Sequence, residues 1–124
     1  MASSAGFHEA EESLRPATRD RHRAIVSLSE ELEAIDWYDQ RIDAADDAEL
    51  QGLLAHNRDE EKEHASMTLE WLRRRDPVLD RHLRTYLFTT EPVTDVEAEA
   101  EAGGAAAGAA AAGSLGIGSS KGDE

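Results

Sequence analysis

Hydrophobic residues recur at three- and four-residue steps along the first half of this chain. That period is typical of an α-helix with one apolar face. No Pro or Gly interrupts it from Thr18 to about Ala45, so the pattern predicts one long helix there. "DAADDAEL" then predicts a turn, in which Asp46 or Asp47 caps a second helix. The apolar positions of the first helix are Ala24, Ile25, Leu28, Leu32, Ile35, Tyr38 and Ile42.

The second predicted helix runs from about Ala48 to Arg75. It ends before Asp76-Pro77, because the residue before Pro disfavours the α region. "PVLDRHLRTYLF" predicts a short third helix that opens with Pro77. The two long helices make an antiparallel hairpin, which buries one face only and is marginal by itself. The predicted fold is therefore all-α, with two hairpins paired into a four-helix bundle.

Composition changes beyond the third helix. "TDVEAEAEAGGAAAGAAAAG" is acidic and then rich in Ala and Gly, and it has no large apolar residue after Val96. Alanines favour partial helix, but the glycines favour a flexible tether. We therefore expect a flexible N-terminal segment (1–17), a helical body (18–94), a flexible acidic and Ala/Gly linker (95–112) and a disordered C-terminal tail. The tail (113–124) contains two isolated apolar residues, Leu115 and Ile117.

Charge narrows the range of partners. The chain has 27 acidic and 13 basic residues, a net charge of −14. We expect it to repel nucleic acid and anionic membranes and to concentrate small cations, although solubility alone also explains such a charge. The absence of cysteine excludes disulfides and thiolate metal sites. The sequence has no signal-peptide core and no run of about 20 apolar residues, so we expect a soluble protein that is not exported.

A candidate metal site lies within "NRDEEKEHASMTLEW". Glu61 and His64 are three residues apart and share a helix face. On the first helix, Glu31 lies between the apolar residues Leu28 and Ile35. Two carboxylates and an imidazole aimed into a bundle are costly unless a cation neutralises them. Ferritin-like di-iron bundles use one Glu on each of two helices and Glu-x-x-His on each of the others.

This chain therefore offers half of a di-iron ligand set, and a dimer would complete it. The alternative is a solvated charge run with Glu–Lys pairs, since Glu-x-x-His also occurs by chance. Tyr38 either contacts a ligand or is a core tyrosine. Two further sets are either functional or simply solvated helix faces. These are a collecting site for the incoming ion, formed by Glu30, Glu33 and Trp37, and an exposed outer metal site, formed by His56, Glu60 and Glu63.

Three longer strings, "EELEAIDWYDQR", "AHNRDEEKEHASMTLEWLRRR" and "HLRTYLFT", resemble the encapsulated ferritins, the ferritin-like cargo of bacterial encapsulin nanocompartments. The resemblance covers 18–94 and the C-terminal "GSLGIGS". It implies a two-helix chain that dimerises to complete a ferroxidase centre and then forms a homodecamer. It also implies oxidation of Fe(II) to Fe(III) by oxygen, with the iron stored inside the encapsulin shell.

The resemblance also assigns residues. It implies that Glu31, Glu61 and His64 hold two irons per dimer, that Tyr38 lies near them, and that the collecting and outer sets bind metal. The C-terminus resembles an encapsulin-targeting peptide that would dock on the shell protein, although Ser120 stands where Leu is common. The matching residues are Gly113, Ser114, Leu115, Gly116, Ile117, Gly118 and Ser119. The alternatives are another di-iron oxidoreductase, such as a peroxidase, and a non-catalytic helical cargo or adaptor.

Overall fold

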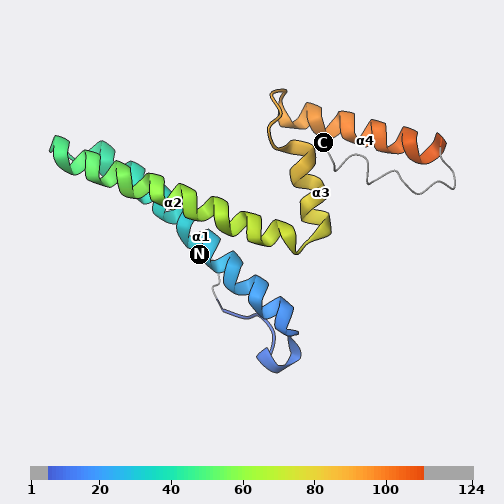
Figure 1. Ribbon diagram of the computed structural model, residues 1–124, viewed down its shortest axis with the longest axis horizontal. Coiled ribbons are helices and arrows are strands. Elements are labelled where there is room, and N and C mark those ends of the chain that lie inside the picture. Colours follow the sequence, from blue (N-terminus) through green and yellow to red (C-terminus); the bar gives the residue numbers. More distant parts are fainter. Residues whose placement is uncertain (1–5, 111–124) are drawn as a thin grey trace. The chain divides into compact units, whose positions relative to one another are not determined.

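The computed structural model describes residues 6–110, with side chains placed as far as residue 104. Over this part the chain is helical, as expected, with elements η1 (Glu11–Ser13), α1 (Pro16–Ala44), α2 (Ala48–Arg74), α3 (Pro77–Tyr86) and α4 (Val93–Ala110) (Figure 1). The chain divides into two compact units, Met1–Leu72 and Arg73–Glu124. None of the described helices is long and apolar enough to span a membrane.

The first unit is a long antiparallel hairpin of α1 and α2 with a tight turn at 45–47. The Asp47 carboxylate accepts a hydrogen bond from the Leu50 N–H at 2.8 Å, so Asp47 is the cap residue. The Gln51 side chain donates to the backbone carbonyls of Ile42 (3.2 Å) and Ala45 (2.6 Å). These bonds occupy carbonyls that the end of α1 leaves without a helical partner.

The hairpin buries little of its own apolar surface. On α2, Ala65 and Leu72 are buried, whereas Leu53 and Met67 are 56% and 62% exposed. On α1, Ile25 and Leu32 are exposed to a similar extent. A helix pair that covers only one face of each helix leaves such stripes open, as the sequence pattern predicts.

The segment before the hairpin is more ordered than expected. A flexible segment was predicted for 1–17, but η1 and the start of α1 at Pro16 lie within it. The Arg19 guanidinium donates to the carbonyls of Glu11 (3.0 Å) and Leu14 (2.9 Å), and the Phe7 ring lies against His22 with centroids 4.6 Å apart. The side chains of α1 therefore hold residues that sequence polarity alone assigns to a loose end.

In the second unit, α3 begins at Pro77, as predicted. The Asp76 carboxylate accepts hydrogen bonds from the N–H groups of Val78 (3.1 Å) and Leu79 (3.0 Å) and caps the helix. Within α3, Asp80 accepts from Arg73 and from the Arg84 Nε at 3.0 Å. The hydrogen bond from Arg73, followed by that from Arg84, holds the pKa of Asp80 below its ordinary value.

Most of the segment predicted as a linker, 95–112, is helical in the described residues, because α4 runs from Val93 to Ala110. The Pro92 carbonyl accepts from the N–H groups of Asp95 and Val96, which starts the helix. Alanine has the highest helix propensity and outweighs the glycines here. Val96 is buried, and burial raises the pKa of Tyr86 on α3, with smaller contributions from Glu97 and Glu101. The predicted targeting residues 113–119 lie outside the described part of the chain.

Candidate metal site

The contacts between α1 and α2 determine which residues lie level with one another along the hairpin. Arg58 on α2 contacts Asp39 on α1 at 2.9 Å. Farther from the turn, an open hollow of about 440 Å³ is lined by Ser27 of α1 and by Met67 and Thr68 of α2, among others. The two helices are antiparallel, so each step back along α1 corresponds to a step forward along α2. Counting from either contact places Glu31 level with 63–66, a stretch that contains His64.

Glu31 has a polar atom that nothing in the described part of the chain satisfies. Its Oε1 is buried from solvent and has no hydrogen-bond partner there. A buried carboxylate oxygen without a partner costs free energy, and the charged form costs most. Leu28 and Ile35, the neighbouring positions on this face of α1, are half-buried. Among the predicted ligands, Glu31 is therefore the one with a buried oxygen that a bound cation would satisfy.

Glu61 and His64 lie beside each other on α2, as the three-residue spacing predicts. The Glu61 Oε1 is 3.7 Å from the His64 Nδ1. The His64 Nε2 is 3.9 Å from the Oε1 of Glu60. Both distances exceed hydrogen-bond length, so neither ring nitrogen forms a hydrogen bond to Glu60 or Glu61. The Glu61 side chain is 27% exposed and that of His64 is 47% exposed.

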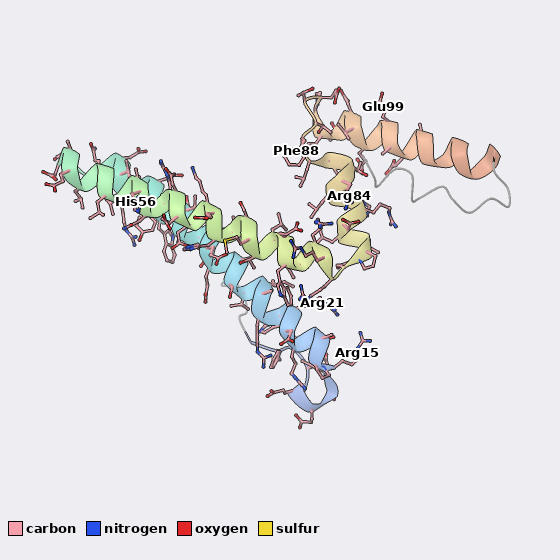
Figure 2. All side chains as sticks on the ribbon, viewed as in Figure 1. Arg15, Arg21, His56, Arg84, Phe88 and Glu99 are labelled. Atoms are coloured by element: carbon pink, nitrogen blue, oxygen red, sulfur yellow. The ribbon has the colours of Figure 1, made fainter. Side chains whose placement is uncertain are left out.

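The predicted outer set overlaps with this pair. His56 lies on α2 (Figure 2). Its Nε2 is 3.7 Å from the Oε2 of Glu60. Glu60 therefore stands between His56 and His64, each one helical turn away. Glu63 is exposed, seven residues from His56 on the same face of α2. The proximity of Glu60 to His64 was not predicted, although their four-residue spacing on a helix indicates it.

The remaining predicted residues lie on α1. Glu30 and Glu33 are exposed, and Trp37, on the same side of the helix, is 51% exposed. Tyr38 is half-buried, and the Arg41 guanidinium carbon lies 5.4 Å from the centroid of its ring. That distance is within the range of a cation–π contact.

The structure does not gather these residues into a complete site. Among the described residues, no group of three or more His, Asp or Glu side chains is placed so that it could hold a metal ion. Glu31, Glu61 and His64 nevertheless fit a metal by donor type, because two carboxylates and an imidazole suit iron.

Sequence reasoning also missed Arg58. Its NH1 donates to Asp39 and its Nε donates to Asp59 at 3.2 Å. The hydrogen bond to Asp39, followed by that to Asp59, raises the pKa of Arg58. Asp39 and Arg58 are 19 residues apart and belong to different helices, so no local spacing marks them as partners.

Known ferritin-like proteins resemble this chain. The EncFtn-like family model matches residues 6–90. The "Encapsulated ferritin-like protein" of Rhodospirillum rubrum is 62% identical over 98% of this chain and 91% of its own length. A "Ferritin-like protein" of Thermotoga maritima is 50% identical over 78% of this chain and 85% of its own.

A solved structure agrees. The crystal structure of protein NE0167 from Nitrosomonas europaea superposes with a TM-score of 0.69 at 59% identity, covering 71% of this chain and 97% of that one. Together with the match over residues 6–90, this similarity shows the family: the chain belongs to the EncFtn-like family of encapsulated ferritin-like proteins.

Proposed function

We propose that this protein is a ferroxidase, which oxidises Fe(II) to Fe(III) at a di-iron centre completed by two copies of the chain. The observation that carries the proposal is the buried Oε1 of Glu31, which has no hydrogen-bond partner among residues 6–110 and lies level with His64 along the hairpin. Membership of a family of ferritin-like proteins supports iron as the ion. Iron is here the substrate.

Two copies related by a two-fold axis would bring together two sets of Glu31, Glu61 and His64. Such a centre matches the ligand set of ferritin-like bundles, in which carboxylates and Glu-x-x-His motifs come from four helices. The carboxylates offset the repulsion between two divalent ions and keep them close together. Each Fe(II) gives up one electron, and dioxygen is the acceptor.

The apolar surface of the hairpin supports the pairing. On α2, Leu53 lies seven residues before Glu60 and Met67 lies seven residues after it. Both side chains are more than half exposed. They flank the part of the helix that carries His64. Burying them against a second hairpin would gain stability at roughly 25 cal/mol per Å². Further association into a decamer rests on the family resemblance alone.

The other predicted residues take supporting roles in this proposal. Glu30, Glu33 and Trp37 are exposed, which suits a site that collects the incoming ion. Tyr38 would lie near the irons. His56 and Glu60 would belong to an outer metal site with Glu63.

The partner that we propose is an encapsulin shell protein, which residues 113–119 would bind. The name of the Rhodospirillum rubrum relative, "Encapsulated ferritin-like protein", supports this proposal. The protein would then act inside the encapsulin compartment, in the cytoplasm, and deliver Fe(III) for storage there.

The test is Fe(II) oxidation in air, followed by absorbance, for the intact protein and for Glu31→Ala, Glu61→Ala and His64→Ala. The proposal expects oxidation well above the buffer rate for the intact protein and a loss of more than about 100-fold in each variant, beyond the ~10–100-fold typical of outer-sphere partners. Asp43→Ala, which removes an exposed carboxylate of α1 outside the proposed sites, is the matched control. Variants that match the intact protein would mean a solvated charge run and a non-catalytic cargo. Faster consumption of hydrogen peroxide than of oxygen would mean a peroxidase-like enzyme.

A further inference from the structure

Arg58 connects the two helices of the hairpin near the candidate site. Its NH1 donates to the Oδ1 of Asp39 on α1 at 2.9 Å, and its Nε donates to the Oδ1 of Asp59 at 3.2 Å. The Arg58 side chain is only 25% exposed, whereas that of Asp39 is 53% exposed. One planar guanidinium therefore uses two of its edges and spans from α2 to α1.

The position of this contact matters for the ligands. Arg58 lies three residues before Glu61, and Asp39 lies eight residues after Glu31. A slide of one residue between α1 and α2 would move a ligand by about 1.5 Å along the axis. Metal–ligand distances tolerate only about 0.2 Å. Within one hairpin, α1 has no buried residue and α2 has only Ala65 and Leu72, so few side chains resist such a slide. A side-chain link close to the ligands would add to that resistance.

The charge of Arg58 is also accounted for. A guanidinium within one turn of Glu61 would repel an incoming divalent ion if it pointed at the site. Its hydrogen bonds to Asp39 and Asp59 direct it to α1 and to the neighbouring residue, and they offset its charge. Partly exposed ion pairs of this kind add little to stability. Stability alone is therefore a weak reason for this pairing.

We propose that Arg58 and Asp39 form a register clamp. It sets the positions of Glu61 and His64 along α2 relative to that of Glu31 along α1. Both are positioning residues and do not touch iron. The clamp rests on the proposed function, because it presumes that these three side chains bind iron.

The test is anaerobic Fe(II) titration of the full chain at a temperature well below its thermal unfolding midpoint. The proteins compared are the intact protein, Arg58→Gln, Asp39→Asn and the double variant. Circular dichroism checks that each variant keeps its helices. Arg23→Gln is the control. It removes the same charge from an exposed pair with Asp20 that lies within α1 and does not link the helices.

The clamp predicts that each single variant binds Fe(II) about tenfold more weakly, the effect typical of losing an outer-sphere partner. It also predicts that the double variant is no worse than either single variant, since both break one contact. Arg23→Gln should bind as the intact protein does. A merely stabilising contact would lower the unfolding midpoint and leave the iron affinity unchanged.

The clamp is overturned if Arg58→Gln tightens binding while Asp39→Asn weakens it, because those opposite signs mean that only charge matters. Unchanged affinity in both variants, or losses that add in the double variant, would also overturn it. If the intact protein binds no Fe(II), the proposed function itself fails. If the intact protein binds iron and the variants bind it equally well, only the clamp fails. Should Arg58→Gln lose its helices, Asp39→Asn still decides the matter.

Discussion

Two carboxylates, one in each unit, differ in what surrounds them. Asp80 in the second unit accepts hydrogen bonds from Arg73 and Arg84, and these bonds lower its pKa. Glu31 in the hairpin has a buried Oε1 with no hydrogen-bond partner in the described part of the chain. The Asp80 carboxylate finds its hydrogen-bond partners within one chain. The Oε1 of Glu31 finds none among the described residues, and a buried polar atom without a hydrogen-bond partner points to a ligand.

The charges of the two regions differ in the same way. Residues 6–72 contain 18 acidic and seven basic residues, whereas 73–90 contain five arginines and two aspartates. The hairpin therefore attracts cations, while α3 has enough arginine to satisfy its own acids. An acidic side chain therefore indicates a binding function when it is buried without a hydrogen-bond partner, as Glu31 is among the described residues, and not when arginines bind it, as they bind Asp80.

The largest expected effect is at Glu31. Glu31→Met should lower Fe(II) oxidation by more than about 100-fold, beyond the loss of an outer-sphere partner. Without metal it should instead raise the stability of the protein by about 1–3 kcal/mol, because the unsatisfied oxygen is gone. Iron-free thermal unfolding and oxidation in air measure the two effects. Asp43→Met, at an exposed position of α1 outside the proposed sites, is the control. A Glu31→Met variant that is less stable without metal and still oxidises iron would contradict the role of Glu31 as an unsatisfied iron ligand.

The second unit should respond to packing rather than to metal. Val96→Asp puts a charge at a position that is 8% exposed on α4 and should cost α4 its packing against α3, roughly 2 kcal/mol. Hydrogen exchange of the α4 amides measures this loss. Val93→Asp changes a residue that is 63% exposed and should have little effect. Equal exchange in the two variants would contradict the packing of α4.

Asp80 should give the second unit a dependence on acid. Its folded pKa lies below the ordinary 3.8, so the unfolded chain takes up the proton first as the pH falls. The stabilisation is therefore complete above about pH 4 and is lost as the pH falls through the lowered pKa. Asp80→Asn should lower the unfolding midpoint of α3 at neutral pH and flatten its acid dependence. Asp43→Asn, at an exposed position, should do neither; a similar change in both variants would remove the special role of Asp80.

The smallest expected effect is at Tyr86. Burial is the main cause of its raised pKa, with Glu97 and Glu101 adding to it. Replacing both glutamates by Gln should bring the pKa of Tyr86 part of the way back towards 10.0. Absorbance titration of the phenolate in a Tyr38→Phe background isolates this one tyrosine. Glu99→Gln is the control, and an equal shift there would mean that the charges act without regard to position.

Local signals in the sequence predicted the long helices, the turn and the start of α3. Asp47 and Asp76 cap helices because of chemistry that lies within three residues of each. The helix α4 was missed because its alanines and glycines oppose each other, and the packing of Val96 that decides the outcome is not local.

Some residues of the candidate site were likewise predictable from local signals, and others were not. The spacing of Glu61 and His64 was readable, and the apolar neighbours of Glu31 marked it as unusual. The contact between Arg58 and Asp39 was not predictable, because it depends on how two helices align across 19 residues. Side chains that position ligands are therefore the part of a site that sequence reasoning finds last.

The central claim is that two copies of the chain complete one iron site. Native mass spectrometry of the protein loaded with Fe(II) under anaerobic conditions tests it most directly, because it counts iron and chains in the same particle. We expect two irons per pair of chains, found on assemblies with an even number of chains and absent from single chains. Iron bound just as tightly to single chains would contradict it.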